Sequence, residues 1–125
     1  MRQAEKKILV VEDEKLMIWS LGISLAKWGF NVCPVSTAAE AIVQLENCGF
    51  DVILLDYQLP DQDGLQVARR AREMHPAAVI FLVTAFQLNE ISVDAGLIDG
   101  YFNKPLDLQQ LRQALISIPA CASST

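Results

Sequence analysis

The chain has 125 residues, of which 52% are hydrophobic and 20% are charged, and its formal net charge is −5. This length and composition predict one globular domain that buries a core without disulfides or structural metals. The acidic balance disfavours direct nucleic-acid binding, and neither a membrane-spanning apolar run nor a secretory signal is visible, so we expect a soluble, cytoplasmic protein with no membrane contact.

Strands and helices are expected to alternate along the chain. Short apolar runs predict five strands, at 8–11, 31–35, 52–55, 79–83 and 100–102. Segments with helical periodicity follow each strand, at 14–28, 37–47, 63–75, 88–95 and from 107 onward. The alternation predicts a single doubly wound α/β domain, (βα)5, with a five-stranded parallel sheet. We expect its core to cover about 7–118 and residues 119–125 to form a flexible tail.

Polar residues come at or just after the ends of four of these strands. They are Glu12, Asp13, Asp56, Thr84 and Lys104. Each alone has an ordinary explanation, such as a helix cap or a turn. Because ligands bind beyond the carboxyl ends of parallel strands, however, all five residues are expected at one edge of the sheet. Clustered carboxylates repel one another, and Mg²⁺ with oxygen ligands relieves that repulsion. The hydroxyl and the ammonium group could then neutralise a phosphoryl group on Asp56.

Four motifs in this order resemble the receiver domain of response regulators in two-component signalling, including chemotaxis-regulator-like receivers. They are ILVVEDE, VILLDYQLPDQDG, FLVTA and YFNKP, and the likeness runs from Lys7 to about Ile118. The resemblance implies a flavodoxin-like fold. It also implies a phosphorelay protein that takes its phosphoryl group from a sensor histidine kinase or a histidine phosphotransfer protein.

The resemblance assigns a role to each acidic residue of the site. Asp56 would be the phosphoacceptor and become 4-aspartylphosphate. Asp13 would bind Mg²⁺ directly, together with Asp56 and the backbone carbonyl of Gln58. Glu12, which stands where the family often has aspartate, would act mainly through a metal-bound water.

The remaining matched residues would sense the phosphoryl group. Lys104 would contact a phosphoryl oxygen, and its bond to Pro105 would be cis. Thr84 would move toward the phosphate on activation and let Tyr101 swing inward, so these two residues form the expected switch.

One departure from the family affects the switch and leaves a second function open. The stretch between Thr84 and Lys104 is shorter than usual, and Leu97 stands where glycine often ends the fourth helix. A receiver-fold interaction domain that works without phosphorylation is therefore an alternative. An aspartate-nucleophile phosphatase is a further one, although it would require paired aspartates and a cap region. In the leading interpretation the protein is a signalling module and not an enzyme.

The first predicted helix has an unusually apolar outer side. Its core-facing residues are Met17, Leu21, Leu25 and Trp28. The opposite side carries Ile18, Trp19, Gly22, Ile23 and Ala26. This set predicts a partner surface, either for the helical bundle of a kinase or phosphotransfer protein or for a second copy in a homodimer. The alternative is ordinary surface, with Trp19 folded onto its own helix.

Overall fold

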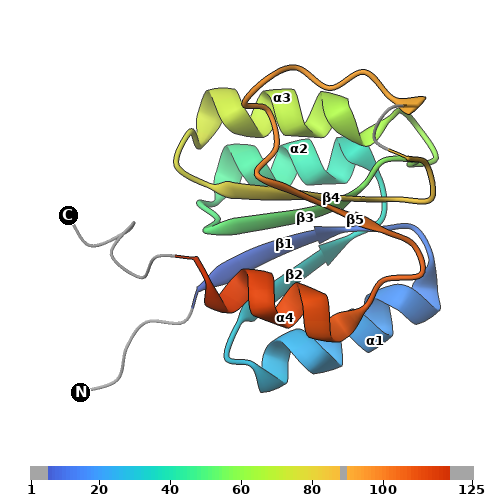
Figure 1. The fold of residues 1–125 in the computed structure, drawn as a ribbon. Helices are drawn as coiled ribbons and strands as arrows, with labels where there is room; N and C mark the ends of the chain where they lie inside the picture. Colours follow the sequence, from blue (N-terminus) through green and yellow to red (C-terminus); the bar gives the residue numbers. More distant parts are fainter. Residues whose placement is uncertain (1–5, 88–89, 119–125) are drawn as a thin grey trace.

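A parallel sheet of five strands, in the order β2-β1-β3-β4-β5, forms the centre of the molecule (Figure 1). The computed structural model describes residues 6–87 and 90–118, and the expected tail, 119–125, lies outside this part. The strands are β1 (Lys7–Val11), β2 (Asn31–Val35), β3 (Val52–Asp56), β4 (Val79–Thr84) and β5 (Gly100–Asn103). The sheet confirms the predicted doubly wound α/β fold.

Strand β3 runs through the middle of the sheet and is buried along its whole length. Its residue Ile53 pairs with Leu9 of β1 on one side and with Ile80 of β4 on the other. An apolar run without alternation is typical of a strand that is covered on both faces. The rigid, doubly flanked strand therefore fixes the position of Asp56 at its carboxyl end.

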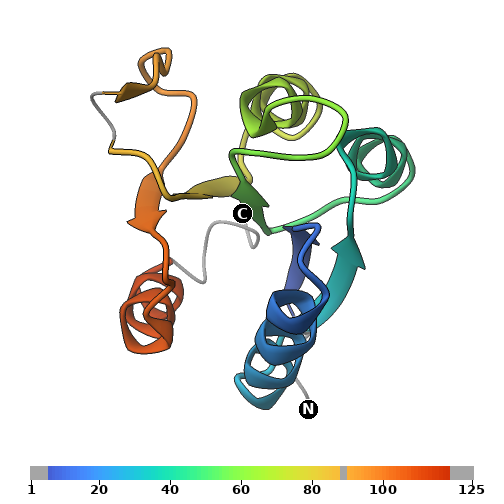
Figure 2. The same ribbon diagram turned by 90° about the vertical axis from the view of Figure 1, so that its right-hand side faces the viewer.

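Helices cover both faces of the sheet. Helices α2 (Ala38–Asn47) and α3 (Gly64–Met74) lie on one face, and α1 (Lys15–Lys27) and α4 (Leu108–Ile116) lie on the other (Figures 1 and 2). Successive strand residues alternate between the two resulting cores, because side chains of a strand point to opposite faces. No helix in the described part of the chain is long and apolar enough to cross a membrane.

The predicted fourth helix, 88–95, is wrong for the residues that the structure describes. Residues 90–95 form no α-helix, so α4 is the fifth predicted helix and the described part contains four α-helices. Ile91 and Val93, two residues apart, both pack against the core beneath α3, and Leu97 is buried. A spacing of two suits extended backbone, and β-branched residues are weak helix formers. We refer to residues 90–99 as the 90–99 segment.

Arg72, near the end of α3, holds the far end of the 90–99 segment. One guanidinium nitrogen, Nη1, donates to the carbonyls of Pro76 at 3.0 Å and Ala78 at 2.8 Å. The other, Nη2, donates to the carbonyl of Leu97 at 2.9 Å and to Asp99 Oδ2 at 2.9 Å. The segment is therefore attached to α3 by polar contacts as well as by apolar packing.

The loop after β3 is anchored on the neighbouring helix. Asp61 accepts hydrogen bonds from the backbone N–H groups of Ala38 at 2.9 Å and Ala39 at 3.0 Å, in the first turn of α2. Asp63 accepts from the N–H of Leu65 at 2.9 Å and so caps α3, as predicted. These contacts fix the second half of the loop that leads from Asp56 to α3.

Candidate functional site

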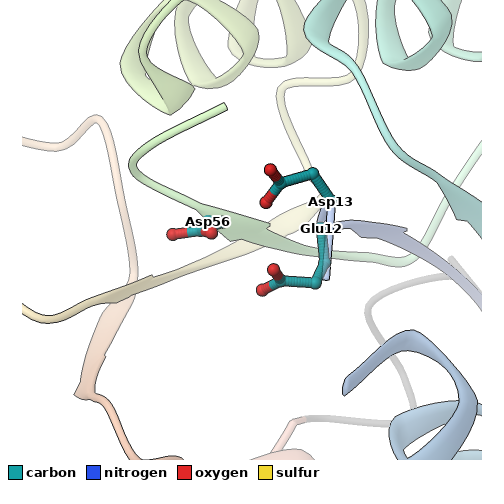
Figure 3. A group of neighbouring side chains, drawn as sticks. All are labelled: Glu12, Asp13 and Asp56. Atoms are coloured by element: carbon teal, nitrogen blue, oxygen red, sulfur yellow. The ribbon is translucent and has the colours of Figure 1, made fainter. Parts of the chain in front are cut away.

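Four neighbouring strands bring the predicted polar residues to one edge of the sheet. Glu12 and Asp13 follow β1, Asp56 and Thr84 end β3 and β4, and Lys104 follows β5. Figure 3 shows the three carboxyl groups gathered at this edge, and one oxygen of each lies within 4.8 Å of the others. The strand order thus turns residues that are far apart in the sequence into one acidic cluster.

Lys104 lies between the two buried acids of this cluster. Its ammonium nitrogen is 2.9 Å from Asp56 Oδ2 and 3.4 Å from Glu12 Oε1. Only 5% of Asp56 and 3% of Glu12 is exposed to solvent, whereas Asp13 is exposed. The peptide bond from Lys104 to Pro105 is cis, as expected. One cation therefore faces two carboxylates that are largely removed from water.

The buried ionisable groups of the site change one another's pKa. Burial raises the pKa of Glu12 above its ordinary value and the charge of Asp56 adds to this, although the Glu14 N–H and Lys104 oppose it. Burial lowers the pKa of Lys104, but its hydrogen bond to Asp56 and the charges of both acids outweigh this effect. The pKa of Lys104 therefore lies above its ordinary value, and the lysine stays charged at neutral pH.

The chemistry of the donor set fits a hard divalent cation. Three carboxylates and one ammonium group leave an excess of negative charge, and all the available ligand atoms are oxygens. Gln58 is exposed in the adjoining loop, and its N–H donates to Asp56 Oδ1 at 3.3 Å. Glu12, Asp13, Asp56 and the carbonyl of Gln58 are the groups that would hold Mg²⁺.

Replacing Glu12 with glutamine is expected to change how stability depends on pH. A carboxyl group whose folded-state pKa is raised binds protons more tightly in the native state than in the unfolded state. Its contribution to stability is therefore lost as pH rises from about 4.5, the ordinary value, through the raised value. In metal-free buffer, urea unfolding is measured as pH rises from about 4.5 through the raised pKa of Glu12. Over this range Glu12→Gln should lose less stability than the parent. An equally steep loss in the variant would contradict the assignment, and saturating Mg²⁺ should remove the difference.

The two predicted switch residues both contact Phe86. The hydroxyl oxygen of Thr84, which is 1% exposed, accepts a hydrogen bond from the Phe86 N–H at 3.0 Å. The hydroxyl group of half-buried Tyr101 lies 3.2 Å from the Phe86 carbonyl oxygen, one of two acceptors within reach of its single proton. The Phe86 ring packs edge-on against Tyr57, with ring centroids 5.7 Å apart. One residue, Phe86, therefore lies between the two switch residues, with its N–H bound to Thr84 and its carbonyl next to Tyr101.

Asn103 belongs to the same group of contacts, although the sequence did not indicate it. Its amide nitrogen donates to the carbonyl oxygens of Thr84 at 3.2 Å and Phe86 at 2.9 Å, and its oxygen accepts from Tyr101 at 3.0 Å. These partners form no sequence pattern, because two of them lie on a different strand and its extension. Only the pairing of β4 with β5 brings them together.

The outer side of α1 carries the predicted apolar residues, but to different degrees. Trp19 is 67% exposed and Ile23 is 41% exposed. Ala26 is also exposed, whereas Ile18 and Gly22 are half-buried. Leu16 was not predicted and is 74% exposed; its position seven residues before Ile23 places it on the same side of the helix. We call Leu16, Trp19, Ile23 and Ala26 the outer α1 face.

Sequence comparisons relate the chain to signalling proteins. The model of the response regulator receiver domain matches residues 8–116. The transcriptional regulatory protein ZraR of Salmonella typhimurium is 33% identical over 111 residues, which are 86% of this chain and 25% of that protein. A cyclic di-GMP phosphodiesterase of Thermotoga maritima is 35% identical over 108 residues, covering 84% of this chain and 28% of that protein. The chain thus spans only a minor part of these relatives.

Solved receiver structures share the fold. A CheY-like receiver domain from Methylobacillus flagellatus has a TM-score of 0.83 and 28% identity, covering 93% of this chain and 100% of that one. The receiver domain of a sensor histidine kinase from Pseudomonas aeruginosa has a TM-score of 0.79 and 29% identity, covering 90% of this chain and 95% of that one. That structure contains a magnesium ion coordinated in the active-site cleft.

Proposed function

Because the chain belongs to the response regulator receiver domain family of two-component signalling, we propose that it accepts a phosphoryl group on Asp56. The donor is the phosphohistidine of a sensor histidine kinase or a histidine phosphotransfer protein. The observation that carries this proposal is the setting of Asp56. Its carboxylate is fixed at a strand end, lies 2.9 Å from the Lys104 ammonium nitrogen and shares an acidic cluster with Glu12 and Asp13.

The proposed reaction exchanges one bond to phosphorus for another. A carboxylate oxygen of Asp56 attacks the phosphorus, the bond to the donor imidazole nitrogen breaks, and its electron pair leaves with the imidazole. Lys104 donates to an oxygen of the bound phosphoryl group, and the buried Thr84 hydroxyl supplies a second donor from the next strand. The product is an acyl phosphate on Asp56.

The acidic residues prepare this site for a divalent cation. Asp13, Asp56 and the carbonyl of Gln58 would hold Mg²⁺ directly, and Glu12 would act mainly through water. When bound, Mg²⁺ neutralises the charge that the phosphoryl group brings next to the carboxylates. Burial of Glu12 and Asp56 supports this role, because uncompensated carboxylates are costly in a low-dielectric environment.

Phosphorylation would then alter protein–protein interactions through Thr84 and Tyr101. Thr84 turns its hydroxyl toward the phosphoryl group, which breaks the hydrogen bond from the Phe86 N–H, and Tyr101 moves inward. The 90–99 segment stands where the family usually has a helix, so the surface that reports the change differs from the usual one. We place this signalling in the cytoplasm and assign the domain no external substrate.

Two other functions predict different behaviour. A receiver-fold domain that works without phosphorylation has no need for an aspartate that is held by a lysine at a strand end, and Asp56 is so held. An aspartate-nucleophile phosphatase would turn over an external phosphate ester. The acidic cluster and Lys104 are compatible with such chemistry, but the sequence lacks the paired aspartates at the nucleophile strand and the cap region of that class.

Labelling with a small phosphodonor tests the proposed function. Incubation with acetyl phosphate and Mg²⁺ should add one phosphoryl group, and peptide mapping by mass spectrometry should locate it on Asp56. Chelation of Mg²⁺ with EDTA should suppress the labelling. Labelling at another residue, or none under any condition, would contradict the proposal. Steady release of phosphate from simple esters would favour the phosphatase instead.

The outer α1 face is proposed as the surface that meets the phosphodonor protein. It lies on the helix that starts directly beyond Glu12 and Asp13. A cavity of about 500 Å³ next to it is lined by Met17 and Leu21 of α1 and by Lys104 and Leu106. The exposed side of α1 therefore lies near a cavity that reaches Lys104 of the phosphorylation site, which suits the helical bundle that carries a phosphohistidine. A second copy of the chain is the other candidate occupant.

Replacing Trp19 with glutamate and Ile23 with lysine tests this surface. Both side chains are exposed, so the fold and labelling by acetyl phosphate should persist. Transfer from the phosphodonor protein should slow by about tenfold or more, because large apolar side chains dominate binding energy at interfaces. Val43→Glu is a matched control, since Val43 is 51% exposed on α2 across the sheet. Sedimentation of the parent reports the homodimer. If transfer and sedimentation both match the parent, the outer α1 face is ordinary surface.

A further inference from the structure

The side chain of Asn103 connects the two residues of the expected switch. Its amide nitrogen donates to two carbonyl oxygens, of Thr84 at 3.2 Å and of Phe86 at 2.9 Å. Its amide oxygen lies 3.0 Å from the Tyr101 hydroxyl group, which can donate to it. Asn103 ends β5 directly before Lys104, so one side chain contacts the end of β4, the second residue beyond it and the tyrosine of β5.

These contacts hold the backbone of Phe86 on both sides of its Cα atom. The Phe86 N–H donates to Thr84 Oγ1 at 3.0 Å, so the threonine hydroxyl oxygen serves as a local acceptor. The Phe86 carbonyl oxygen accepts from Asn103 and lies 3.2 Å from the Tyr101 hydroxyl group. The Tyr101 hydroxyl has a single proton, so it donates either to this carbonyl or to the Asn103 amide oxygen, and either choice joins Tyr101 to the same group of contacts. Thr84, Phe86 and Tyr101 are therefore linked as one hydrogen-bonded unit.

A turn of the Thr84 hydroxyl toward a phosphoryl group would disturb this unit. The hydroxyl would release the Phe86 N–H, but the Phe86 carbonyl, which belongs to the following peptide group, would still be held by Asn103 with Tyr101 beside it. The backbone on both sides of Phe86 could therefore rearrange only if these contacts also broke. The exposed Asn103 side chain is not needed to fill the core. Asn103 contributes to the structure through hydrogen bonds, because its amide makes two donor contacts and one acceptor contact to three different residues.

We propose that Asn103 is a positioning residue that couples Tyr101 to Thr84 and stabilises the arrangement adopted without a phosphoryl group. This inference rests on the proposed phosphorylation of Asp56, and it specifies what resists the accompanying rearrangement. Removing the amide should favour the phosphoryl-bound arrangement, because hydrogen bonds present in only one of two states bias the equilibrium between them. Asn103 acts through Thr84 and Tyr101 and need not touch the phosphoryl group.

A double-mutant cycle on beryllofluoride binding tests the coupling. Beryllofluoride with Mg²⁺ mimics the phosphoryl group, and its affinity can be measured by titration followed by amide chemical shifts. Asn103→Ala and Tyr101→Phe should each tighten binding by about threefold to tenfold. This range corresponds to losing one or two ordinary hydrogen bonds that stabilise only the unbound arrangement. The double variant should gain clearly less than the product of the two single effects, since both substitutions release the same unit.

Asn47→Ala is the matched control. Asn47 is an exposed amide that donates to a single carbonyl, that of Val43 at 2.9 Å, at the end of α2, which none of the Asn103 hydrogen bonds reaches. It should leave beryllofluoride affinity unchanged. Unchanged or weaker binding by Asn103→Ala, or independent effects of the two substitutions, would overturn the coupling. If the parent protein itself binds no beryllofluoride, the proposed phosphorylation fails, and the role of Asn103 falls with it.

Discussion

Asp56→Asn is expected to abolish labelling by acetyl phosphate completely. The amide lacks the anionic oxygen that attacks phosphorus, yet it has nearly the same shape as the carboxyl group, so the strand end should be preserved. Lys104 keeps Glu12 as a partner at 3.4 Å, which leaves its charge compensated. Intact-mass measurement at saturating phosphodonor should therefore show only unmodified protein. Mg²⁺ should also bind more weakly, because one of the three clustered carboxylates is gone.

Asp51→Asn provides the control for this substitution. Asp51 directly precedes β3, so it lies at the opposite end of the same strand, where it accepts a hydrogen bond from the Lys7 N–H at 2.8 Å. The same change of acid to amide there should leave labelling at the parent level. Full labelling of Asp56→Asn, or loss of labelling in both variants, would show that Asp56 is not the acceptor.

Gly64→Ala is expected to damage both the fold and the site. A Cβ atom on Gly64, the first residue of α3, would collide with the carbonyl oxygen of Asp56 and with Cδ1 of Leu55. Gly64 also donates its N–H to the Tyr57 carbonyl at 2.6 Å, so α3 cannot simply withdraw. Overpacking of this kind costs about 1–3 kcal/mol, and here the obstacle is backbone that carries the acceptor. Urea unfolding should show the loss of stability, and the labelling rate should fall.

Gly22→Ala separates steric collision from the general effect of replacing glycine. Gly22 lies in the middle of α1, and a Cβ atom there meets no other atom within 4 Å. Alanine in a helix interior is favoured over glycine by about 0.5–1 kcal/mol, so this variant should be more stable than the parent. If Gly64→Ala were as stable as the parent and labelled normally, the close approach of α3 to Asp56 would not constrain the site.

The strands and the acidic site could be predicted because their signals are local. Residues 52–55 form an apolar run that ends at a carboxylate, and strand ends in a parallel sheet share one edge. Knowing that edge was enough to place Glu12, Lys104 and Thr84 beside Asp56. The strand order was not needed for this prediction, because the carboxyl ends of all strands in a parallel sheet lie at the same edge.

The 90–99 segment could not be predicted in the same way. Leu88, Ile91 and Ala95 fit a helical spacing, whereas Ile91 and Val93 fit an extended one, so the sequence allows both. The choice depends on contacts with α3, including the hydrogen bonds that Arg72 donates to Leu97 and Asp99. Asn103 was missed for a similar reason, because its partners Thr84 and Phe86 lie 19 and 17 residues away.

The contacts of Arg72 determine which parts of the molecule can open together. The same carboxylate oxygen of Asp99 that accepts from Arg72 also accepts from the Ile80 N–H at 2.8 Å, and the Asp99 N–H donates to the Ile80 carbonyl at 2.7 Å. Releasing the end of the 90–99 segment therefore frees one guanidinium nitrogen of Arg72, Nη2, and exposes the edge of β4 in one event. In native-state hydrogen exchange, we expect the amides of Ile80 and Asp99 to exchange in one cooperative unit that includes the start of β5, and not in a separate loop.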